Sequence, residues 1–218
     1  MDSLELAELL CARVCHDLSG PVGAAAAGAE LFEDMADCAD AETLGLVAAS
    51  AAGAAYRLKF FRAALGPAAS APQSASALRE LIDNYLSTLV SAASPGLQLA
   101  WATAPPGQMD GATARLMLNL VLLAKDALPR GGRITVGTEA GLRVVAYGEP
   151  ATLSDEARTV LQDGKPPAGP KGAQAYFARI LAERQGGCLS VTLSPEGLAL
   201  SVGQGTPPSE GGGAVLGS

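Results

Sequence analysis

The chain contains a single histidine, His16, and an acidic residue, Asp17, follows it directly. Imidazole is neutral and nucleophilic near physiological pH, and a neighbouring carboxylate can orient the ring or accept its proton. Phosphoryl transfer to or from a ring nitrogen needs this combination of side chains. Taken alone, a histidine–aspartate pair is common, and a solvated or hydrogen-bonded helix histidine without a catalytic role is the simpler interpretation.

The sequence around His16 has the pattern of one long helix, from Leu4 to Met35. Its apolar residues recur every three or four positions, and Ser3 is placed to cap the first turn. On such a helix His16 and Asp17 lie about 100° apart, so both can border one exposed strip. Pro21 has no backbone N–H, so the carbonyl oxygen of Asp17 should lose its helical partner and the helix should bend there.

Most residues on the predicted strip around His16 are small, which allows another protein to approach closely. This strip gives the candidate binding residues Ala12, Arg13, Ser19, Gly20 and Gly23.

A second apolar-periodic run, from Glu42 to Leu65, ends at Gly66-Pro67, which is typical of a helix stop. Two long helices with a short connection predict an antiparallel hairpin. A lone hairpin cannot bury both of its apolar faces, so residues 1–66 are expected to pair as a homodimer with a four-helix bundle. Packing against the rest of the same chain is the alternative.

Residues 67–76 are predicted to be a linker, and the pattern then changes to alternating helices and strands up to residue 203. This order predicts a two-layer α/β sandwich with helices on one face of a mixed sheet. Residues 204–218 are rich in Gly, Pro and Ser, and disorder is expected there. Helices are expected at 77–92, 110–128, 154–162 and 173–185, and strands at 97–103, 133–138, 142–147, 188–193 and 198–202.

Composition excludes several classes of protein. Hydrophobic residues make up 49% of the chain, which argues against bulk disorder. The net charge is -7 and no basic run occurs, so direct binding to nucleic acid is not expected. No apolar run reaches the roughly 18–20 residues that a membrane span needs. We therefore expect a soluble cytoplasmic protein.

The four cysteines are not spaced as a zinc ribbon or a redox motif. Cys11 and Cys15 share a helix face, so a metal site with His16 is conceivable. Small buried apolar side chains are the preferred interpretation, and we expect no metal site in the chain itself.

The run from Cys15 to Val22 resembles the phospho-acceptor box of histidine-kinase dimerisation domains. Across the whole chain the resemblance is to ChpT-type histidine phosphotransferases of alphaproteobacterial phosphorelays. These proteins keep the two-domain layout of a histidine kinase but do not use ATP. The resemblance implies a dimeric helical hairpin followed by a sandwich similar to the kinase ATP-binding domain.

The residues that would bind ATP in a kinase are largely absent. Asn119 matches the first asparagine of the kinase asparagine box, but Leu123 replaces the second and offers no oxygen to Mg²⁺. Ala146 stands where an aspartate would accept the adenine amino group. Of the last glycine-rich box only Gly172 remains, and Gln174 replaces its partner. We therefore expect no ATP binding, and we interpret Asn119 as a helix residue with local hydrogen bonds.

The resemblance implies a phosphorelay intermediate with His16 and Asp17 as the catalytic residues. Nε2 of His16 would attack the aspartyl phosphate of a receiver domain, and Asp17 would orient the ring. Arg13 would contact the phosphoryl group or an acidic receiver surface, although a solvated helix arginine is equally compatible with the sequence. The alternatives are a divergent active kinase and a non-catalytic scaffold.

The same resemblance implies the partners of the reaction. These are the receiver domains of a hybrid histidine kinase and of downstream response regulators, together with a second copy of the chain. Mg²⁺ would belong to the receiver, and the chain would need no cofactor of its own. The sandwich is expected to supply part of the docking surface.

Overall fold

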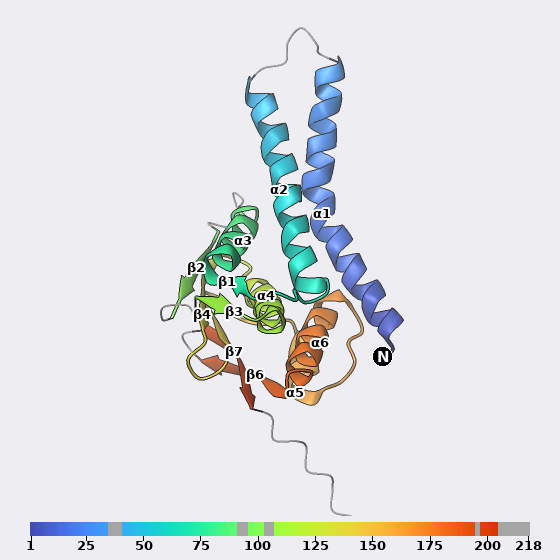
Figure 1. The fold of residues 1–218 in the computed structure, drawn as a ribbon. Coiled ribbons are helices and arrows are strands. Elements are labelled where there is room, and N and C mark those ends of the chain that lie inside the picture. Colours follow the sequence, from blue (N-terminus) through green and yellow to red (C-terminus); the bar gives the residue numbers. More distant parts are fainter. Residues whose placement is uncertain (35–40, 91–95, 103–106, 195–196, 205–218) are drawn as a thin grey trace, which may run out of the picture.

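The structure, a computed structural model, describes residues 1–34, 41–90, 96–102, 107–194 and 197–204. Two long helices, α1 (Ser3–Asp34) and α2 (Ala41–Leu65), form an antiparallel hairpin that projects from the rest of the molecule (Figure 1). This confirms the predicted hairpin. Most of the predicted break between the helices lies outside the described residues. No helix in the described part of the chain combines the length and the apolarity that a membrane span requires.

Asp2, rather than Ser3, caps the first turn of α1. Its Oδ1 accepts hydrogen bonds from the backbone N–H groups of Leu4 and Glu5, at 2.8 and 2.9 Å. In return the Asp2 N–H donates to Oε2 of Glu5 at 2.9 Å. This reciprocal arrangement satisfies donors that the helix itself leaves free. The prediction for Ser3 was wrong because Ser3 already lies inside the first turn.

Residues 73–204, here called the sheet region, form the predicted two-layer sandwich. A five-stranded sheet has the order β2-β4-β5-β7-β6, in which β2 runs parallel to β4 and the remaining neighbours are antiparallel. The helices and main strands of the sheet region are α3 (Ala75–Ser87), β2 (Leu97–Trp101), α4 (Gly111–Asp126), β4 (Gly132–Gly137), β5 (Arg143–Tyr147), α5 (Asp155–Asp163), α6 (Pro170–Glu183), β6 (Gly187–Ser194) and β7 (Gly197–Gln204).

Two details differ from the sequence prediction. Within the predicted linker, β1 (Gln73–Ser74) pairs with β3 (Gln108–Met109) as a two-stranded sheet. The last helix begins at Pro170, before the predicted start at residue 173, because proline is well tolerated at the first helical position. The residues of the predicted tail after 204 lie outside the described residues.

Helix α4 lies at the centre of the molecule, between the sheet and the hairpin (Figure 1). Its side chains are buried on nearly all sides, which explains why its sequence is apolar without a polar face. One face of the sheet packs against it through alternating buried residues, a pattern that a half-covered sheet requires. These are Ile134, Val136, Val144, Ala146, Leu198 and Leu200.

The base of the hairpin shares this core. Phe60 of α2 is fully buried and stacks on Tyr85 of α3 with ring centroids 4.1 Å apart. The last carbonyl groups of α2 accept hydrogen bonds from α4: Nη2 of Arg115 donates to Leu65, and Nδ2 of Asn119 donates to Ala64. Side chains of α4 thus cap the end of α2. The hairpin therefore joins the sheet region through packing as well as through the chain.

Candidate active site

His16 and Asp17 form a contact within α1. The imidazole of His16 is 88% exposed, whereas the side chain of Asp17 is 19% exposed. His16 Nδ1 lies 3.1 Å from Asp17 Oδ1. The ring therefore stands in solvent with one of its nitrogens tethered, where a group carried by another protein can reach it.

This contact determines the chemistry of the neutral ring. An ionised carboxylate only accepts hydrogen bonds, so the ring proton must be on Nδ1 of His16. Nε2 then carries the free lone pair, and it is the nitrogen that makes no contact with Asp17. The arrangement supplies an oriented nitrogen nucleophile.

Pro21 shapes the backbone behind this pair. It deprives the carbonyl oxygen of Asp17 of a helical N–H partner, and Nη1 of Arg57 donates to that oxygen at 2.6 Å. The same guanidinium donates from Nε to Oγ1 of Thr88 at 3.0 Å and from Nη2 to the Thr88 carbonyl at 2.7 Å. One arginine thus joins α1, α2 and the end of α3. The sequence predicted the free carbonyl group but not the arginine that occupies it.

The predicted strip around His16 is exposed at Ala12, Ser19, Gly20 and Gly23. A Cβ atom added at either glycine would meet no atom within 4 Å, so the packing of this chain does not require glycine there. The Ser19 hydroxyl donates to the Cys15 carbonyl at 2.6 Å. These positions leave room beside the ring for a partner surface.

Arg13 does not lie on the exposed strip, contrary to the prediction. Its side chain is only 8% exposed, because it points to α4 and pairs with Asp126 through two contacts. Nη1 lies 2.7 Å from Oδ2 of Asp126, and Nη2 lies 3.0 Å from Oδ1. This bidentate geometry fixes orientation as well as distance. Both interpretations offered by the sequence, a solvated arginine and a receiver contact, assumed an exposed side chain.

A second cation completes what we call the charged cluster, Arg13, Lys125 and Asp126. Nζ of Lys125 lies 3.1 Å from Oδ1 of Asp126. Burial alone would raise the pKa of Asp126, but the two cations outweigh burial and lower it, so the carboxylate stays ionised. Burial opposes protonation of Lys125 and Arg13, yet Asp126 outweighs it and raises the pKa of each.

The sheet region reaches the histidine. A cavity of about 570 Å³ has α1 on one side and the ends of α4, α5 and α6 on the other. Lys171, in the first turn of α6, is exposed at this cavity. No local sequence pattern indicates these neighbours, because contacts such as Arg13–Asp126 join residues that lie 113 positions apart. The lining residues are Ala12, Arg13, His16, Asp17, Lys125, Asp126, Glu156, Pro170 and Lys171.

The two polar residues at the positions compared with the kinase asparagine box and the last glycine-rich box contact each other. Asn119 and Gln174 are fully buried, and Nε2 of Gln174 donates to Oδ1 of Asn119 at 2.7 Å. Asn119 also donates to the Arg115 carbonyl one turn earlier, as expected of a local role, but its bond to Ala64 reaches α2. Both side chains are therefore used to join α2, α4 and α6.

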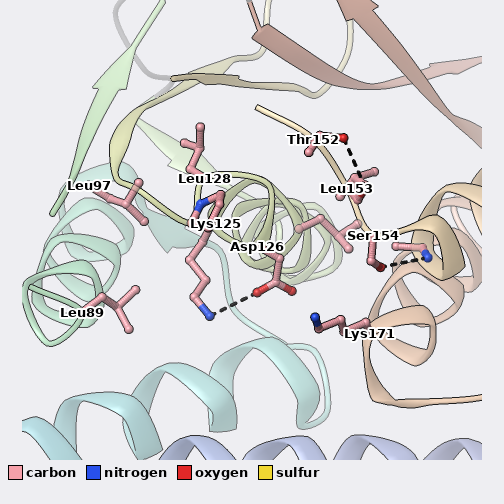
Figure 2. A pocket seen from close by; sticks show the side chains of 12 residues that line it. Leu89, Leu97, Lys125, Asp126, Leu128, Thr152, Leu153, Ser154 and Lys171 are labelled. Atoms are coloured by element: carbon pink, nitrogen blue, oxygen red, sulfur yellow. Dashed lines mark hydrogen bonds and ion pairs between the residues drawn. The ribbon is translucent and has the colours of Figure 1, made fainter. Parts of the chain in front are cut away.

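The other residues compared with the kinase nucleotide boxes also contribute to packing. Leu123 and Ala146 are buried in the core. A Cβ at Gly172 would lie 2.7 Å from side-chain carbons of Glu156 and Pro167, so this glycine permits close packing. The nearby cavity of about 590 Å³ has leucine walls, and its carboxylate, Asp126, is paired with Lys125 (Figure 2).

The cysteines differ from expectation. Cys11, Cys15 and Cys188 are exposed rather than buried, and Cys38 lies outside the described residues. Among the described residues no group of three or more His, Cys, Asp or Glu side chains is placed to hold a metal ion.

Comparison with known proteins gives consistent matches. Residues 78–197 match the family model of the histidine phosphotransferase C-terminal domain. The chain is 31% identical over 215 residues to the protein phosphotransferase ChpT of Brucella abortus (strain 2308), which covers 92% of this chain and 96% of that protein. A solved bacterial phosphotransferase aligns with a TM-score of 0.75 and 26% identity, over 93% of this chain and 97% of the other. The Acinetobacter baumannii histidine kinase AdeS aligns with a TM-score of 0.45 and 12% identity, over 87% and 98% of the two chains.

Proposed function

The chain belongs to the histidine phosphotransferase family, and on this premise we propose that His16 carries the phosphoryl group in a phosphorelay. The observation that carries the proposal is the contact between His16 Nδ1 and Asp17, combined with an 88% exposed ring. This contact leaves Nε2 unprotonated and accessible. His16 is the only histidine in the chain, so no other imidazole can take this role.

The proposed step is a reversible exchange between an aspartyl phosphate and an imidazole. The lone pair of His16 Nε2 forms the N–P bond while the bond from phosphorus to the aspartate oxygen of the donor breaks. The donor recovers its carboxylate. Nδ1 keeps its proton and donates it in a hydrogen bond to the Asp17 carboxylate, which offsets the positive charge that develops on the ring. In the second half of the relay an acceptor carboxylate takes the phosphoryl group from Nε2.

The donor and the acceptor are both receiver domains, drawn from those of a hybrid histidine kinase and of downstream response regulators. The open positions at Ala12, Gly20 and Gly23 support close docking beside His16. Lys171, exposed at the same cavity, adds a cation from the sheet region that suits an acidic, phosphorylated partner. The Mg²⁺ that the reaction needs is assigned to the receiver, and the chain supplies positioning and charge.

The hairpin acts as a homodimer. Apolar side chains on both helices are exposed in the single chain, among them Leu4, Val22, Leu44 and Leu58. A nearly apolar groove between α1 and α2, next to Leu10 and Phe61, continues this surface at the base of the hairpin. A second copy would cover these residues, because pairing of two hairpins buries the faces that one hairpin leaves open.

Transfer from a receiver tests the function. A receiver domain carrying a radiolabelled aspartyl phosphate is incubated with the chain and Mg²⁺, and the label is mapped. We expect acid-labile, alkali-stable phosphate on His16, and none on a His16→Ala variant. Ser190→Ala, on β6 and outside the strip around His16, is the control and should keep the transfer. Label on another residue, or full relay flux through His16→Ala, would contradict the proposal.

A kinase activity makes a different prediction. A divergent kinase would label His16 from radiolabelled ATP with no phosphorylated receiver present. We expect no such label, because Asn119 and Gln174 are hydrogen-bonded to each other and Leu123 has no oxygen for Mg²⁺.

A further inference from the structure

We propose that Asp126 is a positioning residue for phosphoryl transfer: together with Arg13 and Lys125 it holds the His16 helix at a fixed orientation to the sheet region. The inference deepens the proposed function and rests on it. Asp126 is not a catalytic residue in this view, because it contacts the cations of the charged cluster and has no contact with the imidazole.

The geometry places the attachment next to the reacting residue. Arg13 precedes His16 by three positions, which is about one helical turn. Its two contacts to Asp126, at 2.7 and 3.0 Å, restrain the rotation of α1 as well as its distance from α4. Among the described residues this is the ion pair that connects α1 to the sheet region. A change in this ion pair should therefore displace His16 more than it displaces the distant parts of the hairpin.

The other end of the attachment is rigid. Asp126 is the last residue of α4, the helix that is buried between sheet and hairpin. Lys125 pairs with the same carboxylate, as Figure 2 shows. The orientation of Asp126 is therefore set by the core of the sheet region, and the ion pair transmits that orientation to α1.

Stability alone is a weak explanation for this cluster. Removing charged groups from water costs free energy, and the attraction within a partly buried ion pair roughly offsets this cost. Apolar residues of similar size often stabilise the folded state equally well. Breaking the pair would leave the buried charge of Arg13 unpaired, which is costly. The pair therefore favours one orientation of α1 relative to the sheet region. A defined orientation is what an in-line transfer between two proteins needs.

The orientation of α1 relative to the sheet region matters in the complex with a receiver. A receiver that reaches His16 also faces Pro170 and Lys171 of the sheet region, because these residues line the same cavity. The angle between α1 and the sheet region then sets where the phosphorus atom lies relative to Nε2. A misplacement of about 1 Å can slow such a reaction on the order of 100-fold.

The test compares maximal transfer rates at saturating phosphorylated receiver. For Asp126→Asn we expect a rate about 10- to 100-fold lower, with the receiver concentration at half-maximal rate changed less than about threefold. Exchanging the pair, with Arg13→Asp and Asp126→Arg together, should restore a large part of the lost rate. The matched control is Asp83→Asn, which removes an exposed carboxylate that pairs with Arg79 on α3, away from α1.

Each outcome decides the matter. Circular dichroism gives the folded fraction, and rates are expressed per folded protein. A folded Asp126→Asn variant with an unchanged maximal rate overturns the inference, and so does an exchanged pair that folds fully yet transfers no faster than the single variant. If Asp126→Asn does not fold, the maximal transfer rate of the exchanged variant is compared with that of the unmodified chain instead. A folded exchanged variant that keeps a large part of that rate supports the inference, and one that transfers at a negligible rate overturns it. Absence of label on His16 of the unmodified chain would instead contradict the proposed function.

Discussion

Two aspartates close to the same imidazole have different surroundings, and this separates their roles. Asp17 touches the ring and retains some contact with solvent, so it can respond to the charge that develops during transfer. Asp126 is held by Arg13 and Lys125, and each of its oxygens already pairs with a cation. Residue type alone would not distinguish them. Their partners distinguish them, and one partner of Asp126, Arg13, is distant in the sequence.

Substitution of Asp17 tests whether it orients the ring. Asp17→Ala removes the acceptor of the Nδ1 proton, so the neutral ring can also place its proton on Nε2, where the lone pair is needed. We expect the transfer rate to fall roughly 10- to 100-fold. Asp17→Asn keeps an amide oxygen as acceptor but removes the charge, so its loss should be smaller. Single-turnover transfer from a labelled receiver measures both, and equal losses would show that charge rather than orientation matters.

The charged cluster predicts a particular dependence of stability on pH. The folded-state pKa of Asp126 lies below its ordinary value of 3.8, because Arg13 and Lys125 outweigh its burial. Its contribution to stability is therefore complete above that ordinary value and is lost as pH falls through the lowered folded-state pKa. The free energies of unfolding of the unmodified chain and of Asp126→Asn, measured in urea, should converge as pH falls below the ordinary Asp pKa of 3.8. A constant difference between them would show that the carboxylate charge is not responsible.

At the scale of elements, Pro21 and Arg57 form a matched pair. Pro21 removes one backbone donor from α1, and Arg57 on α2 supplies another to the Asp17 carbonyl. Arg57→Ala should lower the free energy of unfolding by about 1–3 kcal/mol, because it leaves acceptors at Asp17 and Thr88 without their partner. Urea unfolding measures the loss.

The double variant measures how much of the stability loss caused by Arg57→Ala depends on the presence of Pro21. In a Pro21→Ala background the new N–H can donate to the Asp17 carbonyl, so Arg57→Ala should cost less there by roughly 1 kcal/mol. Strict additivity of the two substitutions would show that Arg57 does not compensate for Pro21.

Local patterns were sufficient to predict most elements. The three- and four-residue periodicity gave the hairpin, and alternation gave the paired strands β4–β5 and β6–β7. Errors occurred where two local signals compete, as at Asp2 and Ser3, or where a short strand depends on a distant partner, as at Gln73–Ser74.

The candidate site was predictable only in part. His16, Asp17 and the open strip follow from one helix and its period. The burial of Arg13 depends on Asp126, and the approach of Lys171 depends on how α6 packs beside α1. Such contacts are set by tertiary packing, for which a single sequence carries no local pattern.

In the whole molecule, the positions that resemble a nucleotide site serve to join the hairpin to the sheet region. Asn119 binds the end of α2 and also accepts from Gln174, while Asp126 at the end of the same helix binds Arg13 on α1. One helix, α4, thus holds both helices of the hairpin.

The association of two chains is predicted from the exposed face of the hairpin. Leu58 is 48% exposed and lines the apolar groove between α1 and α2. Leu58→Glu would bring a carboxylate from each copy into the contact, and desolvation of an unpaired charge opposes that burial. We expect the dimer dissociation constant to rise on the order of 100-fold, measured by analytical ultracentrifugation.

The sheet region offers a control for this substitution, because Val90, just beyond α3, is 60% exposed and does not line the groove. Val90→Glu adds the same charge at similar exposure, so it should leave the dissociation constant unchanged if the hairpin is the interface. Since both side chains are exposed in the single chain, neither change should unfold it. A Leu58→Glu protein that still sediments as a dimer would place the contact elsewhere, and an unmodified chain that sediments as a monomer at micromolar concentration would exclude the homodimer.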